Sequence, residues 1–517
     1  MERFHTDQAG ASGVPAAARR DAAESLARRL VAGSLDLVSS VAEQALLSPR
    51  LRAPLLRRLE QYVTARAHAN THPDSPDRVR RDQADMVCAV FASVERALAR
   101  GQIARPVLQR LLRALLANAV LRADGRIHDA VRRFARRHGG AYPPIFLVVS
   151  PTRACNLRCI GCYAGAERPA RQLEWPTLER IVTEAEELWG VRFFTISGGE
   201  PLLYRSQGRR LLDLAERHPE CFFQVYTNGC LIDRPTAERM ARAGNIVPAI
   251  SVEGLEARTD ARRGPGVFRR ILAAMAHLRA AGMPFGISIT ATRENAAEVL
   301  SDEFLDFYFH EQQAVFGWLF QYMPIGRGYT VDLVVTPQQR LWMWRRTWQI
   351  IRERRIFLAD FWNCGTVTEG CIAAGTSYLY IDWNGKVMPC VFVPYAACNI
   401  HAIYERGGTL DDVYDLPYFR AIRRWQSDYA SGGGRRRGNW LVPCSLRDHY
   451  ATGRELILRH GAEPEDRAAA EALSDPGYAE RMNAYDAELE RLFDPVWEAE
   501  YTGAGARLCP TARAGAA

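Results

Sequence analysis

The sequence lacks any uninterrupted apolar stretch of the roughly 18 residues that a membrane-spanning helix needs. The nearest approach, from Leu30 to Leu47, contains Asp36 and Glu43. There is no internal repeat, and the opening Met-Glu-Arg-Phe-His does not have the charged-then-apolar pattern of a secretory leader. We therefore expect a cytoplasmic protein, soluble or peripheral to a membrane, whose twelve cysteines remain reduced.

A strong excess of one charge sign is also missing. The net charge is +8 over 517 residues, and it comes mostly from arginines spread along predicted helices. Such arginines are typical of solvated helix faces, so no nucleic-acid partner is expected. Arg263, Arg327 and Arg346 could still hold a phosphate if the fold brings them together.

The most informative segment that is present contains three cysteines, Cys155, Cys159 and Cys162, within Ala-Cys-Asn-Leu-Arg-Cys-Ile-Gly-Cys-Tyr. Three thiolates from one tight loop suit an iron-sulfur cube in which one iron has no protein ligand, and such an open iron can bind a substrate. A zinc site is the alternative, but it would need a fourth Cys or His.

A second motif, Ser-Gly198-Gly199-Glu200-Pro, follows the apolar run from Val191 to Ile196, which predicts a short buried strand. Paired glycines allow a ligand to approach the backbone, and a carboxylate can hold an ammonium group. The motif by itself could be an ordinary turn at the end of a strand. Because the motif follows the cysteine loop along the sequence, a binding site is favoured over an ordinary turn.

Together, the two motifs closely resemble those of the radical S-adenosylmethionine (radical SAM) enzymes, in which a CX3CX2C loop is followed by a GGE motif after the second barrel strand. The resemblance implies that Cys155, Cys159 and Cys162 are catalytic and hold a 4Fe-4S cluster, whose open iron chelates S-adenosylmethionine. It further implies that one electron cleaves this cofactor to methionine and a 5′-deoxyadenosyl radical, which abstracts hydrogen from a substrate. The electron would come from a reductase, a flavodoxin or a ferredoxin.

The order of the predicted strands supports the resemblance. Apolar or β-rich runs alternate with helical segments, which indicates parallel βα units, and six units fit a partial (β/α)6 TIM-like barrel of the α/β class. The runs are Ile145 to Ser150, Arg192 to Ser197, Phe222 to Thr227, Val247 to Val252, Phe285 to Ala291 and Gly317 to Tyr322. Polar residues follow these strands, on the face where barrel active sites are built.

Further cofactor-binding residues are expected after the strands. Asn228 follows the third strand, and Ser251 and Glu253 end the fourth, where related enzymes place side chains that bind ribose hydroxyls. Many relatives carry an aromatic residue just before the third cysteine, where it packs on adenine. Here that residue is Gly161, and Tyr163, on the far side of Cys162, is the aromatic candidate.

A second group of cysteines lies beyond the predicted barrel: Cys364, Cys371, Cys390 and Cys444. Two alternating segments, Tyr378 to Ile381 and Lys386 to Met388, flank Asp-Trp-Asn-Gly, which predicts a β-hairpin. The hairpin would bring Cys371 near Cys390, and the other two thiols could complete four-thiolate ligation of a closed cluster.

This second pattern resembles the auxiliary-cluster domains called SPASM and twitch, in which four residues separate a hairpin glycine from a cysteine. Gly385 and Cys390 keep that interval. Because the dense cysteine run for a second auxiliary cluster is missing, the resemblance implies one auxiliary 4Fe-4S cluster, as in twitch domains. A zinc site, buried free thiols, and Cys398 as a ligand in place of Cys364 are the alternatives.

We predict four parts of the chain: a helical N-terminal domain (1–140), the barrel (141–335), a small α+β auxiliary-cluster domain (336–460) and a helical tail (461–517). The predicted N-terminal helices are Arg20 to Leu47, Leu51 to Ala67, Arg78 to Leu98 and Ile103 to Arg137. They are expected to form a cap on the barrel, or else a platform that delivers substrate or touches an anionic membrane surface. In the tail, Trp497 and Tyr501 could fold back over the barrel mouth.

The whole pattern looks like a little-described subgroup that includes enzymes coupling lipid chains, so we expect an apolar or lipid-like substrate. A peptide-modifying enzyme is the first alternative. The all-helical N-terminal region argues against it, because many peptide-modifying relatives carry a winged-helix recognition domain with β-strands. A non-catalytic metal-binding scaffold is the second, although it would need neither Glu200 nor the ribose-binding side chains.

Overall fold

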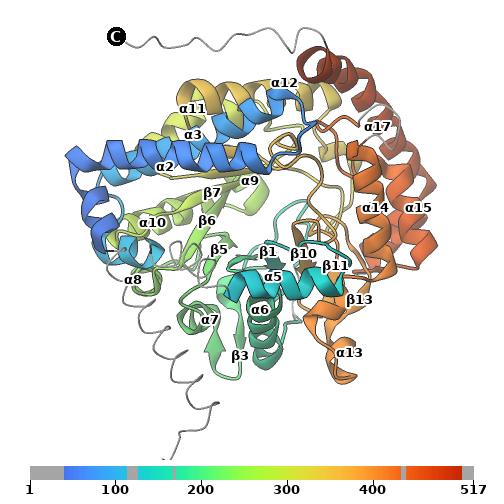
Figure 1. Cartoon of the computed structure of the whole chain (residues 1–517), viewed down its shortest axis with the longest axis horizontal. Coiled ribbons are helices and arrows are strands. Elements are labelled where there is room, and N and C mark those ends of the chain that lie inside the picture. Colours follow the sequence, from blue (N-terminus) through green and yellow to red (C-terminus); the bar gives the residue numbers. More distant parts are fainter. Residues whose placement is uncertain (1–39, 113–125, 167–170, 432–437, 504–517) are drawn as a thin grey trace, which may run out of the picture.

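The computed structural model describes residues 40–112, 126–166, 171–431 and 438–503. A ten-stranded sheet runs through this part of the chain in the order β13-β11-β10-β1-β2-β5-β6-β7-β8-β9 (Figure 1). Six of its strands follow one another along the chain and are parallel. They are β1 (Phe146–Val149), β2 (Phe193–Ile196), β5 (Phe222–Thr227), β6 (Ile246–Val252), β7 (Gly286–Ala291) and β8 (Gly317–Gln321). These strands coincide with the six predicted runs, so the prediction of a partial TIM-like barrel is confirmed.

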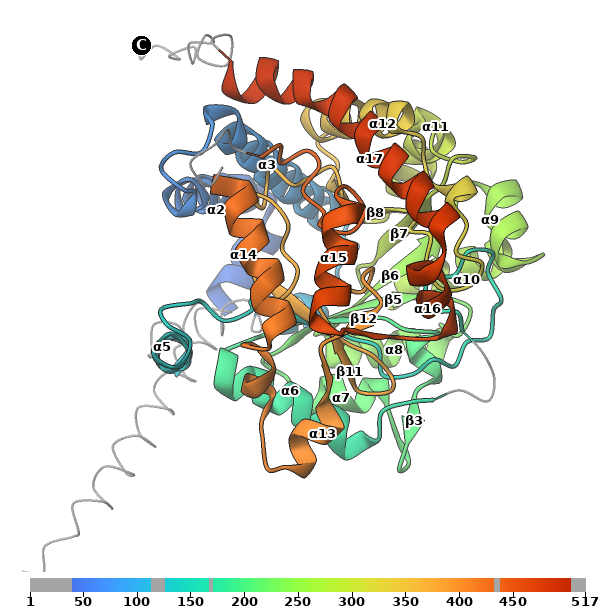
Figure 2. The same ribbon diagram turned by 90° about the vertical axis from the view of Figure 1, so that its right-hand side faces the viewer.

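Helices cover the outside of the six strands (Figures 1 and 2). They are α6 (Trp175–Trp189), α7 (Leu211–Arg217), α8 (Arg234–Ala243), α9 (Glu256–Arg263), α10 (Val267–Ala280) and α11 (Asp302–Leu305), which continues as a π-helix, η3 (Asp306–Glu311). Side-chain caps set some of their starts. Asp233 accepts a hydrogen bond from the backbone N–H of Thr236 at 2.9 Å and begins α8.

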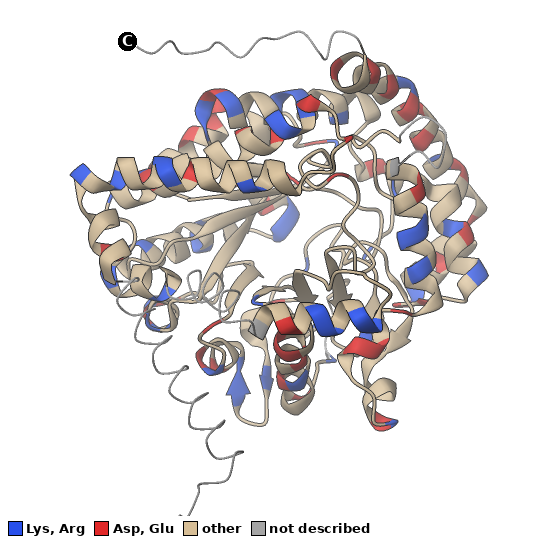
Figure 3. Ribbon diagram, in the orientation of Figure 1, with Lys and Arg blue, Asp and Glu red and all other residues tan. Residues whose placement is uncertain are grey.

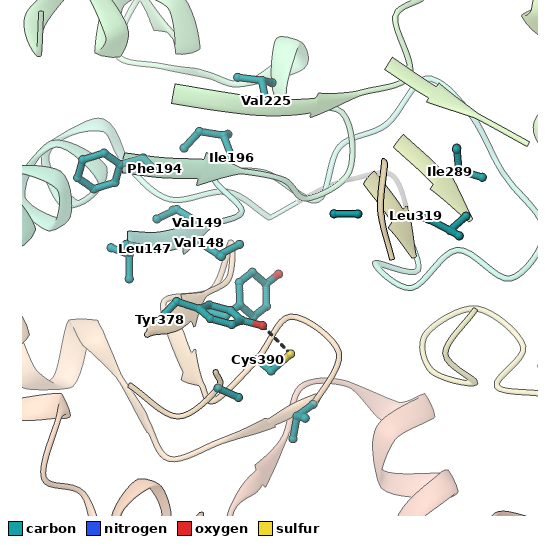
Figure 4. Close-up of a cluster of buried hydrophobic side chains, with 14 of the residues drawn as sticks. Leu147, Val148, Val149, Phe194, Ile196, Val225, Ile289, Leu319, Tyr378 and Cys390 are labelled. Carbon is teal, nitrogen blue, oxygen red and sulfur yellow. Dashed lines mark hydrogen bonds between the residues drawn. The ribbon is translucent and has the colours of Figure 1, made fainter. Parts of the chain in front are cut away.

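Apolar side chains of the strands form the core. Leu147 and Val149 of β1, Phe194 of β2 and Leu319 of β8 are fully buried, and Figure 4 shows them among their neighbours. Strands buried on both faces read as continuous apolar runs, and this is why the six strands could be recognised in the sequence.

The cysteine-bearing hairpin belongs to the same sheet. Its first strand, β10 (Tyr378–Ile381), pairs in parallel with β1 from Phe146↔Tyr378 to Val149↔Ile381, and β11 (Lys386–Met388) pairs antiparallel with β10. At the other edge, β9 (Leu358–Asp360) pairs in parallel with β8. The sheet therefore continues across residue 335, where the sequence predicts a domain boundary, and the predicted hairpin is an extension of the barrel sheet.

Shorter elements complete the chain between the barrel and the tail. The remaining strands are β3 (Arg205–Ser206), β4 (Arg209–Arg210), β12 (Tyr395–Ala396), β13 (Cys398–Asn399) and β14 (Glu463–Pro464). Helical elements are α12 (Pro337–Gln349), which continues as η5 (Ile350–Arg354), α13 (Ile400–Glu405) and α14 (Pro417–Ser431). Short 3₁₀ turns are η1 (Pro201–Leu203), η2 (Glu298–Leu300), η4 (Val331–Leu333) and η6 (Leu410–Val413).

The N-terminal helices are α2 (Pro49–Asn70), α3 (Asp77–Ala99) and α5 (Arg126–Arg137), with further helical residues at 40–47 and 105–112. Most of the first predicted helix lies outside the described residues. α2 and α3 lie side by side in the upper part of Figure 1. α3 also packs against η5, and α5 packs against α6.

The C-terminal helices are α15 (Tyr450–His460), α16 (Arg467–Ser474) and α17 (Pro476–Trp497), which continues as a π-helix, η7 (Glu498–Thr502). Figure 2 shows α17 running beside α12. Trp497 and Tyr501 do fold back and are buried, but the hydroxyl of Tyr501 donates to Asp82 of α3 at 2.6 Å. Their position therefore differs from the expected one over the barrel mouth.

Both charge signs are mixed along the surface helices, as Figure 3 shows for α14 and α15. In the described part of the chain, we find no helix with the length and apolarity needed to cross a membrane.

A buried acid between α15 and α17 makes stability depend on pH. Burial raises the pKa of Asp486 to about 8, although the backbone N–H of Tyr450 donates to its carboxyl group. The folded state therefore keeps the carboxyl group neutral, whereas the unfolded chain ionises it above about pH 4. The stability contributed by this group is lost as the pH rises toward 8.

We expect Asp486→Asn to become more stable than the wild type as the pH rises, by up to about 1.4 kcal/mol per pH unit between pH 6 and 8. Anaerobic urea unfolding at each pH measures the difference. Glu480→Gln on the exposed face of α17 is the matched control. A pH-independent difference between Asp486→Asn and the wild type would contradict the neutral carboxyl group.

Candidate active site

A cavity of about 490 Å³ lies between the barrel strands and the two cysteine-bearing segments. All seven predicted metal ligands line it: Cys155, Cys159, Cys162, Cys364, Cys371, Cys390 and Cys444. Cys398, the alternative ligand, lies on β13 and is not among the lining residues. The fold therefore brings together two groups of thiols that lie some 200 residues apart in the chain.

The three-cysteine loop follows β1 and is tied to two other loops. The carbonyl oxygen of Cys162 accepts the backbone N–H of Arg327 at 2.9 Å, and the backbone N–H of Ile160 donates to the carbonyl oxygen of Arg262 at 3.1 Å. A Cβ at Gly326 would lie 2.1 Å from the carbonyl oxygen of Tyr163. The loop after β8 therefore packs backbone to backbone on the cysteine loop.

The environment of these thiols suits a bound cluster. Burial raises the pKa of Cys155 to about 12 and also raises the pKa of Cys159, although the positive charge of Arg263 opposes the latter shift. The backbone N–H of Leu157 points at the Cys155 sulfur at 3.4 Å. Half-buried thiols that face backbone N–H groups and a cation are the donor set expected for an iron-sulfur cluster.

The glycines of the Ser-Gly-Gly-Glu motif pack against the chain itself. A Cβ at Gly199 would lie 2.3 Å from the carbonyl oxygen of Ala154, and the backbone N–H of Glu200 donates to the same oxygen at 2.7 Å. Gly199 is therefore required for the motif to lie against the segment that precedes Cys155. Both Gly198 and Gly199 also line the cavity.

Glu200 lies behind the cavity wall. Its fully buried carboxylate accepts hydrogen bonds from the Thr227 hydroxyl at 2.7 Å and from the backbone N–H of Asn228 at 2.8 Å. Burial raises its pKa despite these donors. In this structure Glu200 orders the end of β5, and Asn228, which it positions, lines the cavity.

Glu253 is likewise buried, and it pairs with two arginines. Arg263 donates to its Oε1 at 2.9 Å through Nε, and Arg262 lies 2.6 Å from the same oxygen. Burial would lower the pKa of Arg263, but Glu253 and the thiols of Cys159 and Cys162 raise it above the usual value. Both arginines line the cavity and Glu253 does not. Glu253 therefore holds two cations beside the cysteine loop.

The other two predicted cofactor-binding residues, Ser251 and Tyr163, line the cavity. The Tyr163 hydroxyl forms hydrogen bonds with the Ser197 hydroxyl and the backbone N–H of Gly198, and burial raises its pKa to about 12. Its ring meets Phe392 edge-on, with the centroids 6.0 Å apart.

The second cysteine group lies at the β10 side of the cavity. Cys390 accepts a hydrogen bond from the Tyr378 hydroxyl at 2.8 Å, which Figure 4 shows beneath β1. Burial raises the pKa of Cys390 to about 12, and the neighbouring Cys371 raises it further. The pKa of Cys444 is also raised, by burial, by Asp448 and by Cys371. Three of the four thiols are thus close enough to interact electrostatically.

A glycine lets the segment that carries the fourth thiol, Cys364, pack closely on the segment before Cys444. A Cβ at Gly365 would lie 2.2 Å from the carbonyl oxygen of Trp440, so only glycine lets the Cys364 segment approach the segment that leads to Cys444. Backbone N–H groups of Phe392 and Arg447 point at the sulfurs of Cys390 and Cys444, each at 3.4 Å. An all-thiol set with N–H donors to sulfur fits an iron-sulfur cluster. Within the described residues, no three His, Cys, Asp or Glu side chains form a group that could hold a single metal ion.

Comparisons with known proteins now identify the family. Residues 149–302 match the model of the Radical SAM superfamily. The mycofactocin maturase MftC of Mycolicibacterium smegmatis is 30% identical over 313 residues, which cover 57% of this chain and 76% of that protein. The chain belongs to the radical SAM superfamily.

Other relatives share the same region. The AdoMet-dependent heme synthase of Methanosarcina barkeri is 28% identical over 282 residues, covering 48% of this chain and 77% of that protein. Among solved structures, Streptococcus suis SuiB bound to S-adenosylmethionine matches with a TM-score of 0.48 and 19% identity over 61% of this chain and 76% of that chain. Membership confirms the prediction of an enzyme that uses a 4Fe-4S cluster and S-adenosylmethionine. The assignment of individual ligands stays a prediction.

Three cavity residues at this radical SAM site, Arg262, Arg263 and Tyr322, are not among the site residues expected from the sequence. The sequence suggested Arg263 only as a phosphate ligand, although the place of both arginines after the fourth strand could have indicated a role beside the cysteine loop. A Cβ at Gly161, whose φ is +62°, would lie only 2.6 Å from the Tyr322 ring. The ring of Tyr322 therefore fills the space beside the position where many relatives carry an aromatic residue.

This contact predicts that Gly161→Ala lowers the iron content of the three-cysteine loop, because the new methyl group meets the Tyr322 ring in a backbone conformation that favours glycine. The added change Tyr322→Leu should recover part of the iron, because it removes the ring but not the backbone strain. Iron analysis of anaerobically purified variants measures both effects, with Tyr322→Leu alone as the control. Equal iron loss in the single and double variants would contradict the steric explanation.

Proposed function

We propose that this radical SAM enzyme binds its catalytic cluster at Cys155, Cys159 and Cys162 and abstracts hydrogen from an apolar group of a substrate held in the cavity. The observation that carries the proposal is the cavity itself, which extends without a break from these thiols to the second cysteine group. When bound, the reduced cluster supplies the electron that cleaves S-adenosylmethionine to methionine and a 5′-deoxyadenosyl radical.

Side chains at the end of the cavity near Cys155, Cys159 and Cys162 have the chemistry needed to bind S-adenosylmethionine. Arg262 and Arg263, oriented by Glu253, supply positive charge for the methionine carboxylate. Ser251 and Asn228 supply polar groups for the amino acid and the ribose, and Tyr322 supplies an aromatic face for the adenine. Glu200 contributes by holding Asn228 in place.

Aromatic side chains between the two cysteine groups favour an apolar substrate group. Phe320, Phe361 and Phe392 lie with their ring centroids 5.6–5.8 Å apart, and Trp362 lies 4.8 Å from Phe392. Besides the two arginines, Asp360 is the only charged residue in the lining. An unpaired charge on the substrate would be costly to bury against this wall.

Asp360 is already occupied by hydrogen bonds from the protein. Its carboxylate accepts the side-chain amides of Gln321 and Asn363, each at 2.9 Å. The backbone N–H of Trp362 also donates to it, at 3.1 Å. Asp360 therefore stabilises the start of the Cys364 segment, and its charge is not left for a substrate.

We further propose that Cys364, Cys371, Cys390 and Cys444 hold one auxiliary 4Fe-4S cluster, as the resemblance to twitch domains implies. Its place at the far end of the cavity would let it exchange an electron with the substrate. A flavodoxin, a ferredoxin or another reductase would supply the catalytic electron, in the cytoplasm and with or without contact to a membrane surface.

A peptide-modifying activity is the second candidate. The names of two relatives favour it, the mycofactocin maturase and the PqqA peptide cyclase of Gluconobacter oxydans, which is 32% identical over 161 residues, or 30% of this chain. A peptide could present an apolar side chain to the same aromatic wall.

Deuterium transfer distinguishes the two candidates. Extracts of cells grown in deuterated medium are separated into an organic-solvent phase and a peptide fraction, and each is incubated with the enzyme, unlabelled S-adenosylmethionine and dithionite. We expect deuterium in 5′-deoxyadenosine with the organic phase, measured by mass spectrometry. Labelling from the peptide fraction alone would favour the peptide-modifying activity and reject the apolar substrate.

Replacement of Cys155, Cys159 and Cys162 by Ala should abolish formation of 5′-deoxyadenosine and leave roughly four irons per chain at the second group. Cys398→Ala, outside the cavity, is the control and should keep both the iron and the activity. Wild-type rates in the triple variant would reject the catalytic loop. Loss of roughly four irons in Cys398→Ala would make Cys398 a ligand of the auxiliary cluster.

A further inference from the structure

The segment between Cys364 and Cys371 is hydrogen-bonded to the α2–α3 hairpin. The Thr366 hydroxyl donates to Asp82 Oδ2 at 2.9 Å, and the side-chain amide of Gln83 donates to the carbonyl oxygen of Val367 at 3.3 Å. Asp82 and Gln83 are consecutive residues of α3, and both are buried. One turn of an N-terminal helix therefore holds the middle of the cysteine segment.

Asp82 is also bound from three other directions. Arg78, one turn earlier on α3, donates to Oδ1 at 3.1 Å, and Arg352 of η5 donates to the same oxygen at 2.8 Å. The Tyr501 hydroxyl donates to Oδ2 at 2.6 Å. With two cations and two hydroxyl groups on one buried carboxylate, the position of Thr366 is tied to α3, to η5 and to the C-terminal η7.

The end of the segment is held by the connection between α2 and α3. The Glu369 carboxylate accepts hydrogen bonds from the Ser75 hydroxyl and, at 3.1 Å, from the backbone N–H of His72. Glu369 has a φ of +56°, a left-handed conformation that is unfavourable for a residue with a side chain. The contacts with His72 and Ser75 compensate for this conformation two residues before Cys371.

We infer that the α2–α3 hairpin positions Cys364 and Cys371 for the auxiliary cluster, with Ser75, Asp82 and Gln83 as positioning residues. The inference rests on the proposed ligand set. It gives the N-terminal helices a role distinct from a general cap, because their contacts converge on the eight-residue segment that carries two of the four thiols.

The test isolates the auxiliary cluster by using the chain in which Cys155, Cys159 and Cys162 are Ala. In this background we measure the anaerobic release of iron to a chelator and the electron paramagnetic resonance spectrum of the reduced cluster. Thr366→Val and Ser75→Ala should each accelerate iron release roughly two- to tenfold, the factor that corresponds to one net hydrogen bond. Their spectra should differ from that of the parent chain.

Glu60→Gln is the matched control. Glu60 lies on α2 and accepts a hydrogen bond from the Cys88 thiol of α3 at 3.1 Å, so it belongs to the same hairpin but not to the hydrogen bonds given above for the cysteine segment. It should leave iron release and the spectrum unchanged. Glu369→Gln keeps the shape of the side chain and serves as a milder test variant if Ser75→Ala fails to fold.

The outcomes separate the inference from the proposed function. If the triple-Ala chain holds no iron, the proposed ligand set is wrong and the inference falls with it. If it holds roughly four irons and the test variants release them at the parent rate with the parent spectrum, only the inference is overturned. Faster release with an altered spectrum, absent in Glu60→Gln, supports it.

Discussion

The parallel pairing of β10 with β1 is the constraint on which the site depends. Because β1 leads into the three-cysteine loop and β10 lies between Cys371 and Cys390, this pairing brings the two thiol groups to one cavity. Parallel strands need long crossover connections, and here the connection is the rest of the barrel. The second cysteine group is therefore separated from β1 by the whole chain from β2 to β9, and the Tyr378 side chain that reaches Cys390 comes from the pairing strand itself.

Close backbone contacts and buried ion pairs also fix the positions of the two cysteine-bearing segments. Gly199 and Gly365 each stand where a Cβ would lie within 2.3 Å of a carbonyl oxygen, and each brings a motif against a cysteine-bearing segment. Near the first thiols, Glu253 holds Arg262 and Arg263. Near the second, the buried pair of Arg340 and Asp448 fixes the residues after Cys444. Such pairs specify position more than they add stability, since burying each charge is costly.

The strands and the cysteine groups could be predicted from the sequence because they depend on local signals. The buried strand β1, Phe-Leu-Val-Val, is a continuous apolar run, and the Asp-Trp-Asn-Gly turn marks its hairpin. The surroundings of Glu200 and Glu253 could not be predicted. The sequence does not show that Thr227 and Asn228 donate hydrogen bonds to Glu200, or that two arginines pair with Glu253. The extension of the barrel sheet by β10 also escaped prediction, since strand partners distant in sequence leave no local pattern. Trp497 and Tyr501 were expected at the barrel mouth for the same reason.

Asp82 connects the second cysteine group to residues that are distant from it in the sequence. Its buried carboxylate joins α3, η5, the segment after Cys364 and η7, which come from the N-terminal, middle and C-terminal parts of the sequence. No single one of these elements carries a recognisable signal for the others, because an Asp among the mixed charges of a helix such as α3 is typical of a solvated face. The sequence correctly predicted that the N-terminal region is helical, but it could not show that these helices reach the cysteine segment. The hydrogen bonds of Asp82, Gln83 and Ser75 reveal that connection.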